Sequence, residues 1–345
     1  MKTPAVRGQT LIGDGDHLKY SVVSQIKVID REGDGDVDHL YFGDLGGQVF
    51  RIDLDKAHGA SDTATNYAQQ ITHIYNGHKE NGYSICFYEM PTFTVYNGAG
   101  GLFAVVSIGS GNRSTPLLGK LVNNQYITEN ETAETNGFLI NDAVYNIYDK
   151  VVVTAAPHTA TLQTSPAIND LHALTDANRI SNPTMATWKE VATATQGADG
   201  QTQTNLAKSG WYYTFTSSAL LTASDARKSV EKVQGELIAI DNDLYVSTFD
   251  ADGVGTTEAC GAGIYGNSRA HRFCMPYGQC ASGDTVGNNT LVLGKGLLGI
   301  TMGPGAGTGD RRIVTPLNEA GGNQITGTNY AANNRLIPQS WYEKN

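Results

Sequence analysis

The sequence predicts an all-β protein in which many short strands are joined by turns and long loops. Glycine accounts for 40 of the 345 residues, well above its usual share of about 7%. Charged residues make up 17% of the chain, against a typical value of about 25%. Stretches of the helix-favouring residues Glu, Lys and Leu are scarce, whereas Thr and Asn are plentiful. Because 40% of the residues are hydrophobic, the chain has enough apolar surface to form a packed core.

Strand–turn–strand units are the clearest local signals. In residues 39–54, the β-rich runs "HLYFGD" and "QVFRIDL" flank the glycine turn "LGG" and predict a hairpin. A second hairpin is predicted at residues 236–249, where "DND" separates "ELIAI" from "LYVSTF". Further strands are predicted from Gly101, in "GLFAVVSIGSGN", and from Gly210, in "GWYYTFT". Helical periodicity is weak, and "SDARKSVEKV" at residues 224–233 is a short helix candidate.

The strand pattern leaves two architectures open. A chain of 345 residues is long enough for one large domain or two ordinary ones. No fixed-period repeat is evident, but irregular four-strand units with long insertions are typical of a divergent β-propeller. A β-sandwich with long loops fits the same strand signals. The pattern by itself predicts an all-β, loop-rich fold and no more.

Charge and hydropathy exclude several classes of function. The formal net charge is −10 and the sequence pI is about 5.2, which argues against nucleic acid and anionic membrane surfaces as partners. No run of 18 or more apolar residues is present, so no membrane-spanning helix is expected. Behind Lys2, "TPAVRGQTLIGDGD" lacks the apolar core of a signal peptide. The chain is therefore expected to be cytosolic or to be the downstream part of a longer secreted polypeptide.

Cysteine usage favours the secreted alternative. The chain has an even number of cysteines and no CxxC pair; they are Cys86, Cys260, Cys274 and Cys280. Cys274 and Cys280 flank "MPYGQ", whose Pro-Tyr-Gly can turn the chain and bring the two sulfur atoms together. We therefore expect a disulfide between these two residues, although four cysteines allow three pairings. The alternative is that the cysteines are reduced and buried as small apolar residues.

The segment "DREGDGDVD" at residues 30–38 concentrates carboxylates in a single turn. Five acidic side chains fall within these nine residues: Asp30, Glu32, Asp34, Asp36 and Asp38. Two like charges about 4 Å apart repel by roughly 4 kcal/mol at an effective dielectric constant of about 20. A hard divalent cation turns this repulsion into attraction, because Ca²⁺ accepts six to eight oxygen ligands in flexible geometry. We predict that the turn binds calcium; the alternative is a solvated acidic turn that binds nothing.

The spacing of these residues follows the first nine positions of an EF-hand loop. Acidic side chains stand at positions 1, 3, 5 and 9, and Gly35 stands at position 6, where such a loop turns sharply. Asp36, at position 7, would offer its main-chain carbonyl. Position 12, normally a bidentate Glu, is Tyr41, and His39 is expected to lie on the following strand. Mg²⁺ prefers rigid octahedral geometry, and no thiolate or imidazole in the loop favours zinc.

Other motifs give weaker signals. "GDGD" at residues 13–16 offers only two carboxylates, and "DADGVGTTE" at residues 250–258 has Val254 where a fifth-position acid would stand. No GxSxG, HExxH or Walker A pattern is present. Nothing in the sequence proposes a nucleophile, so the chain is not expected to be an enzyme.

The acidic loop and its sequel resemble the calcium-blade signature of the type IV pilus tip-associated adhesins, the PilY/PilC family. In residues 30–54, "DREGDGDVDHLYFGDLGGQVFRIDL", an Asp-rich nine-residue loop runs into an aromatic-Gly-Asp turn and then an aromatic-Arg-x-Asp-Leu strand. Later segments resemble the family in the same order; they are "SIGSGNRSTPL", "SGWYYTF", "KVQGELIAIDNDLYVSTF", "ACGAGIYGNSRAHRF" and the terminal "SWYEKN". The resemblance extends from Tyr20 to the C-terminus.

The resemblance implies a modified quinoprotein-like β-propeller with long loops, spanning residues 1–345 as one domain. It also implies a calcium ligand set: the side chains of Asp30, Glu32, Asp34 and Asp38, and the main-chain carbonyl of Asp36. Glu32 departs from the family, which has Asp or Asn there, and its extra methylene crowds the loop. In the family, further blades and an adhesive N-terminal domain precede this loop, whereas 29 residues precede it here. We therefore expect the C-terminal part of a longer protein, with a propeller incomplete on its N-terminal side.

The resemblance also implies a function at the bacterial surface. The expected protein binds calcium, supports type IV pilus assembly, opposes pilus retraction and adheres to cells or surfaces. Its expected partners are minor pilins or other pilus tip components and a host or surface receptor. It would reach the outer membrane or pilus tip through the periplasm.

Two rival functions remain. One is a structural β-domain in which calcium only staples a turn. The other is a quinoprotein dehydrogenase, which also combines a propeller with calcium. The chain has three tryptophans and no adjacent cysteine pair, which argues against such an enzyme.

Overall fold

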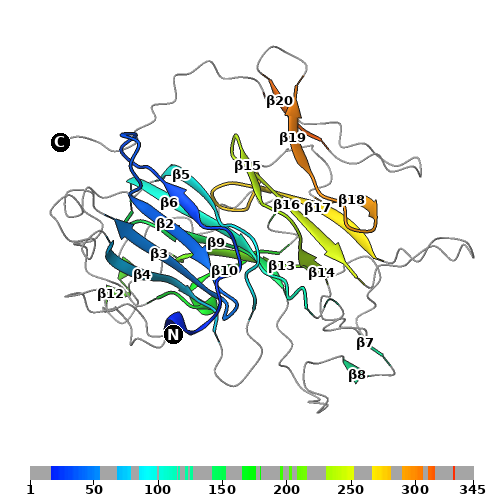
Figure 1. Ribbon diagram of the computed structural model, residues 1–345, viewed down its shortest axis with the longest axis horizontal. Coiled ribbons are helices and arrows are strands. Elements are labelled where there is room, and N and C mark those ends of the chain that lie inside the picture. Colours follow the sequence, from blue (N-terminus) through cyan, green and yellow to red (C-terminus); the bar gives the residue numbers. More distant parts are fainter. Residues whose placement is uncertain are drawn as a thin grey trace, which may run out of the picture.

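Strands dominate the part of the chain that the structure describes, so the predicted all-β fold is confirmed (Figure 1). Two three-residue 3-10 helices, η1 (His17–Lys19) and η3 (Ile168–Asp170), accompany the strands. Within the described ranges, no helix is long and apolar enough to cross a membrane. The computed structural model describes residues 17–54, 68–78, 85–98, 101–114, 116, 121–122, 125–126, 142–152, 165–175, 179, 195–196, 202–203, 208–215, 231–251, 266–280, 290–305, 310–314 and 329–330.

The first sheet carries the acidic loop. It is an antiparallel meander of four consecutive strands: β1 (Lys27–Ile29), β2 (His39–Gly43), β3 (Gln48–Leu54) and β4 (Ala68–Asn76). β2 and β3 form the hairpin predicted at residues 39–54, which is thereby confirmed. The acidic loop, residues 30–38, joins β1 to β2, and the amide of Asp38 donates to the carbonyl of Ile29 over 2.9 Å to close it.

The second sheet has the strand order β10-β13-β9-β6-β5. Its strands are β5 (Thr92–Gly98), β6 (Gly101–Gly109), β9 (Ala143–Asp149), β10 (His172–Ala173) and β13 (Gly210–Thr214). All neighbours are antiparallel except β10 and β13, which are parallel. The strands predicted from Gly101 and from Gly210 are both confirmed.

The third sheet has the order β14-β16-β17-β18, and β15 also pairs with β16. Its strands are β14 (Glu231–Val233), β15 (Ile238–Ile240), β16 (Asp243–Asp250), β17 (Asn267–Cys274) and β18 (Thr290–Lys295). The hairpin predicted at residues 236–249 is confirmed as β15 and β16. Its turn residues Asp241 and Asn242 have φ values of 47° and 70°, as tight primed turns require.

The helix candidate at residues 224–233 is wrong at its C-terminal end. Glu231–Val233 form strand β14, because these residues pair with β16 of the third sheet. Pairing in the sheet overrides the weak local preference for a helix. Residues 224–230 lie outside the described residues.

Three smaller sheets complete the described strands. β19 (Thr301–Pro304), β20 (Arg311–Val314) and β21 (Asn329–Tyr330) form one of them. The others are the pairs β7 (Leu121–Val122) with β8 (Gln125–Tyr126), and β11 (Thr195–Gln196) with β12 (Thr202–Gln203).

The second sheet is buried on both faces, between the first and the third (Figure 1). Successive side chains of a strand point to opposite faces, and β6 shows this directly. Ala104 and Val106 belong to a core cluster with Tyr41 of the first sheet, whereas Val105 belongs to a cluster with Phe273 of the third. Sheets stacked in succession are arranged as propeller blades, which favours the propeller over a two-sheet sandwich. Among the described residues, the sheets do not close into a ring.

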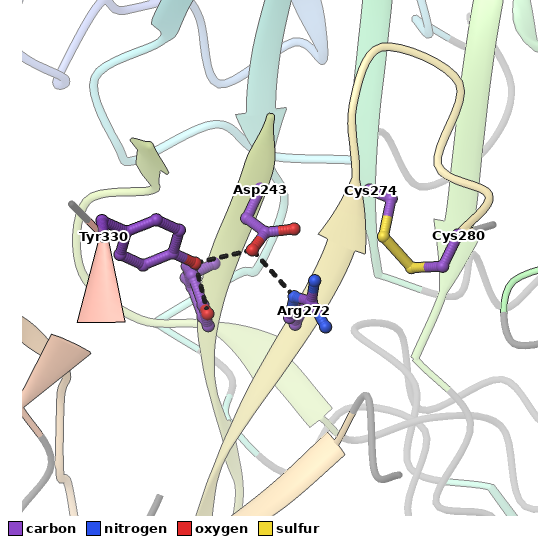
Figure 2. Close-up of a disulfide and its surroundings, with 6 residues drawn as sticks. Asp243, Arg272, Cys274, Cys280 and Tyr330 are labelled. Carbon is purple, nitrogen blue, oxygen red and sulfur yellow. Dashed lines mark hydrogen bonds and ion pairs between the residues drawn. A yellow bond between two sulfur atoms is a disulfide. The ribbon is translucent and has the colours of Figure 1, made fainter. Parts of the chain in front are cut away.

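A buried polar cluster joins the third sheet to β21. The hydroxyl of Tyr330 donates to Asp243 Oδ2 over 2.6 Å and lies 2.7 Å from the hydroxyl of Tyr245. Arg272 Nε lies 2.9 Å from the same Asp243 oxygen. Figure 2 shows this cluster beside the disulfide that follows β17. The charge of Asp243 is therefore satisfied where the two sheets meet.

The predicted disulfide between Cys274 and Cys280 is confirmed (Figure 2). The segment between them docks on the second sheet, because the carbonyl of Pro276 accepts hydrogen bonds from Trp211 Nε1 at 2.8 Å and from the Tyr148 hydroxyl at 3.1 Å. The disulfide loop therefore ties the second and third sheets together. Elsewhere, half-buried Cys86 donates to a main-chain carbonyl, and Cys260 lies outside the described residues.

Replacing Cys274 and Cys280 together by Ser is expected to destabilise the protein. The two residues are six apart in sequence, and closing so short a loop stabilises the folded state by about 2 kcal/mol. Urea unfolding of the oxidised wild type and the double variant would measure the difference. Cys86→Ser serves as the control, with a smaller effect expected. Equal unfolding midpoints for the wild type and the double variant would contradict the role given to the disulfide.

Candidate metal centre

The carboxylates at the two ends of the acidic loop hold its backbone closed. Asp30 accepts the amide of Gly33 at 2.6 Å and that of Gly35 at 2.9 Å, one on each oxygen. Asp38 Oδ2 accepts the amide of Arg31 at 2.6 Å and that of Glu32 at 3.3 Å. The hydrogen bond from Gly35, with those from other loop amides, lowers the pKa of Asp30 below its usual value. Part of the negative charge is thus stabilised by main-chain dipoles.

Glycine allows the loop to turn at two places. Gly33 has a φ of 73° and Gly35 a φ of 93°, values that side chains with a Cβ rarely adopt. The predicted role of Gly35 at the sharp turn is therefore confirmed. Between Gly35 and the next strand, the amide of Asp36 donates to Asp34 Oδ1 over 2.9 Å.

The donor set of the loop suits a hard cation, although the side chains do not converge. Glu32 and Asp34 are exposed, and Asp30, Asp36 and Asp38 are half-buried. All five supply oxygen atoms, the ligands that calcium takes. In the described part of the chain, no three His, Cys, Asp or Glu side chains are close enough together to hold a metal ion. The calcium ligand set stays a prediction, and filling it requires these carboxylates to turn inward.

The strand after the loop connects the loop to a buried network of ion-paired side chains. His39 and Tyr41 of β2 lie directly opposite Asp53 and Arg51 of β3, so all four side chains share one face of the hairpin. His39 Nδ1 lies 2.8 Å from Asp53 Oδ1, which confirms that His39 lies on the strand and shows what it contacts there.

Arg51 is the centre of this network. Its guanidinium is 1% exposed and donates to both oxygens of Asp53, at 2.8 and 3.0 Å. It also reaches Asp149, at the end of β9 in the second sheet, at 2.7 and 2.6 Å. The Tyr41 hydroxyl donates to Asp149 Oδ2 over 3.1 Å. Arg51 therefore bridges two sheets with charged hydrogen bonds.

The pKa values of the network follow from burial and pairing. Burial by itself would raise the pKa of Asp53, but the hydrogen bond to His39 and the charge of Arg51 lower it below its usual value. Burial, reinforced by Asp149, raises the pKa of Tyr41 well above normal. The carboxylate of Asp53 is thus ionised and paired, and the phenol of Tyr41 is kept neutral.

The sequence reading missed this network, although a signal was present. In "QVFRIDL" two charged residues, Arg51 and Asp53, interrupt an apolar strand at a spacing of two. That spacing places both on one face of a strand. The sequence therefore allowed the prediction that this charged pair has a buried partner, but not that the partner is Asp149.

The turn between β2 and β3 lets the first sheet approach the second closely. Asp44 Oδ1 accepts the amides of Gly46 and Gln48, each at 2.9 Å, and burial raises the pKa of Asp44 to about 6. A Cβ on Gly43 would lie 2.6 Å from a side-chain atom of Ile108 and 2.7 Å from one of Phe87. The aromatic-Gly-Asp turn is thus a packing feature here.

A second buried charged cluster lies in the third sheet, and the sequence reading missed it as well. His271 Nε2 lies 2.7 Å from Glu231 Oε1, and the Thr248 hydroxyl donates to the same oxygen. Arg269 Nη1 donates to Glu231 Oε2 over 2.7 Å. Thr290 Oγ1 lies 3.0 Å from His271 Nδ1. These side chains come from four strands of the third sheet, β14, β16, β17 and β18.

Burial and charge act in opposite directions on Glu231. Burial would raise its pKa, but the charge and hydrogen bond of His271, together with Arg269 and Thr248, lower it to about 2. Burial lowers the pKa of His271, and Glu231 offsets only part of that effect. At neutral pH the pair is therefore an ionised carboxylate beside a neutral imidazole, and the charge of His271 acts on Glu231 only in the acid range where the imidazole is protonated.

Among the described residues, the remaining sequence candidates bring no further site together. Residues 13–16 lie outside the described residues, as does most of 250–258. In that second stretch, Asp250 ends β16 and pairs with Arg269 at 3.4 Å. In the glycine-rich segment at the end of β6, a Cβ on Gly109 would lie 2.5 Å from Val233, and one on Gly111 would lie 2.7 Å from Lys232. These glycines allow close packing against β14.

Gly35→Ala is expected to destabilise the protein by about 1–2 kcal/mol, because an L-residue is strained at positive φ. A Cβ on Gly35 would meet nothing within 4 Å, so the expected cost comes from the backbone conformation and not from a steric clash. Gly299→Ala is the matched control: it has equal space and no positive φ. Urea unfolding should show a lower midpoint for Gly35→Ala only. If both variants unfold at the same midpoint, the turn conformation assigned to Gly35 is wrong.

Low pH is expected to reduce the contribution of Glu231 to the free energy of unfolding. Because its pKa is lowered in the fold, from 4.5 to about 2, the stabilisation is complete above 4.5 and is lost as the pH falls toward 2. At neutral pH, Glu231→Gln is expected to lower the free energy of unfolding by about 3 kcal/mol, since it breaks a buried pair. Denaturant unfolding at several pH values should show this difference shrinking below 4.5. A difference independent of pH, or one matched by exposed Glu236→Gln, would contradict the assignment.

The similarity of this chain to known proteins is low. No protein-family model matches the sequence, and no curated protein matches it. Among solved structures, the chain is similar to the crystal structure of the Pseudomonas aeruginosa PilY1 C-terminal domain. The two share 16% sequence identity with a TM-score of 0.49, and the match covers 84% of this chain and 58% of that one. At this level the match is a likeness of fold, and it assigns no residue, ligand or partner to this chain.

Proposed function

We propose that this chain is a calcium-binding component of the type IV pilus system on the bacterial surface. The observation that carries the proposal is the acidic loop at residues 30–38 running directly into the β2–β3 hairpin. Its order of Asp-rich loop, aromatic-Gly-Asp turn and aromatic-Arg-x-Asp-Leu strand is the order found in the PilY/PilC adhesins. The positive φ of Gly35 and the amide bonds to Asp30 support a loop backbone that is already folded.

The proposed ligands are the side chains of Asp30, Glu32, Asp34 and Asp38 and the carbonyl of Asp36. A bound ion would supply positive charge to a turn whose carboxylates otherwise repel one another. Accepting an amide hydrogen does not exhaust a carboxylate, because its two oxygens together offer about four acceptor positions. Asp30 and Asp38 can therefore hold the backbone and the ion together.

The proposed mechanism is linkage between ion binding and folding. Calcium binds the folded loop and not the unfolded chain, so calcium at 100-fold above its dissociation constant stabilises the fold by about 2.7 kcal/mol. The ordered blade then presents a surface that minor pilins or other tip components recognise. In this proposal the protein supports pilus assembly, opposes retraction and contributes to adhesion. Its location is the outer membrane or pilus tip.

Two other functions are distinguished from this proposal by separate measurements. In the first, calcium staples the turn and affects stability alone. In the second, the chain is a quinoprotein-type enzyme. Phenotype separates the first from the proposal, and a bound quinone absorbing in the near ultraviolet would be needed for the second.

Calorimetric titration of calcium into EDTA-stripped protein should give binding with a stoichiometry of about one ion per chain, as a single site requires. Magnesium should bind more weakly. Asp34→Asn removes one ligand charge but keeps an oxygen that can accept the amide of Asp36, so it should weaken calcium binding without unfolding the loop. Glu236→Gln removes an exposed charge between β14 and β15 and should leave calcium binding unchanged.

The outcomes separate the functions. Absence of calcium heat, together with a melting temperature that calcium does not change, would exclude the calcium proposal. If Asp34→Asn weakened binding and lowered the calcium-dependent melting temperature, but piliated cells carrying it assembled and retracted pili normally, the ion would be a structural staple only.

A further inference from the structure

Arg31 is the basic residue of the acidic loop, and its side chain points inward. It stands at the second position of the loop, between Asp30 and Glu32. Its relative exposure is 6%, whereas its neighbour Glu32 is exposed. A guanidinium is rarely buried so far unless it is paired, so its contacts define what it does.

Arg31 contacts two of the proposed ligands. Its main-chain amide donates to Asp38 Oδ2 over 2.6 Å. Its Nη2 donates to Glu32 Oε1 over 3.3 Å. The residue thus holds one acidic side chain through its backbone and another through its guanidinium.

The other branch of the guanidinium leaves the loop. Arg31 Nη1 lies 3.5 Å from the carbonyl of Val152, at the limit of a hydrogen bond. Val152 follows β9 in the second sheet, and its amide and that of Val151 both donate to Asp149 Oδ1 over 3.1 Å. Asp149 is the carboxylate that binds Arg51. Arg31 therefore connects the loop to the buried network between the first and second sheets.

We infer that Arg31 is a positioning residue that transmits the ion state of the loop to the junction of the first and second sheets. The inference rests on the proposed calcium site. A cation in the loop competes with Arg31 for Glu32, because both are attracted to the same carboxylate. Once Glu32 turns to the ion, the guanidinium is drawn more strongly to the Val152 carbonyl, and that long contact shortens. Calcium then stabilises the turn formed by residues 149–152.

Hydrogen exchange of the Val151 and Val152 amides reports on this turn. Calcium is expected to slow their exchange in the wild type. In Arg31→Met calcium still binds, but the slowing is lost, because Met cannot donate to Val152. Arg31→Lys keeps the charge but lacks the planar fork that reaches two acceptors at once, so it should lose the slowing too. Arg311→Met removes an exposed arginine on β20 and should respond like the wild type.

A calcium-free arm tests the same coupling separately. Glu32→Gln removes the carboxylate that competes for Arg31, and it should slow exchange at Val151 and Val152 without any ion. In the Arg31→Met background, Glu32→Gln should have no effect on these amides.

The two proposals fail in different ways. If calorimetry detects no binding of calcium to the wild type, the calcium site is excluded. The calcium-free exchange experiment then decides whether Arg31 couples the loop to the turn at residues 149–152. The coupling is overturned if Glu32→Gln slows the exchange of the Val151 and Val152 amides equally in the wild-type and Arg31→Met backgrounds. It is also overturned if wild-type protein binds calcium and the two amides do not respond, or if Arg31→Met responds as the wild type does.

Discussion

The buried guanidinium of Arg51 fixes the relation between the first two sheets. It joins Asp53 on its own strand to Asp149, which is 98 residues distant in sequence. Removing one partner of such a buried pair leaves an uncompensated charge and costs about 3–5 kcal/mol, so the two sheets are held at a defined distance. The acidic loop ends one residue before His39, which is held by the same Asp53. The position of the loop therefore depends on a charged interaction in the core.

Close approach of the sheets is the second constraint, and glycine satisfies it. A Cβ on Gly43 would collide with Ile108 of the second sheet, and one on Gly109 would collide with Val233 of the third. Gly278, in the disulfide loop, lies against Trp211 in the same way. The high glycine content, which by itself predicts turns, thus has a second cause. Several glycines lie where two sheets meet and leave no room for a side chain.

Features set by neighbouring residues were predictable from the sequence. The β2–β3 and β15–β16 hairpins follow from alternating apolar residues and turn residues, and the disulfide follows from a turn between two nearby cysteines. The sharp turn at Gly35 follows from its place among the acidic residues. Where a distant strand decided the outcome, as for Glu231–Val233 pairing with β16, the local prediction was wrong.

Features set by distant residues were not predictable in this way. Alternating strands suit a sandwich and a propeller equally, because both bury one face of each strand. The distinction depends on which sheets share a core cluster. The same holds for Arg51 with Asp149 and for Glu231 with His271, since each pair unites strands that lie apart in the chain. The role of Arg31 was not predictable for a related reason: in an acidic turn, a lone basic residue suggests local charge balance, and its burial is visible only in the fold.

The electrostatics of the loop explain why its backbone can be ordered while its carboxylates remain available to a cation. Five carboxylates face one guanidinium within nine residues, so local pairing leaves most of the negative charge uncompensated. Main-chain amides, which carry a partial positive charge, donate hydrogen bonds to Asp30, Asp34 and Asp38. These dipoles lower the repulsion between the carboxylates without neutralising their charge. Each of these carboxylates keeps acceptor capacity after binding an amide. The loop is therefore shaped by its own backbone, and the charge that remains is what a divalent ion would compensate.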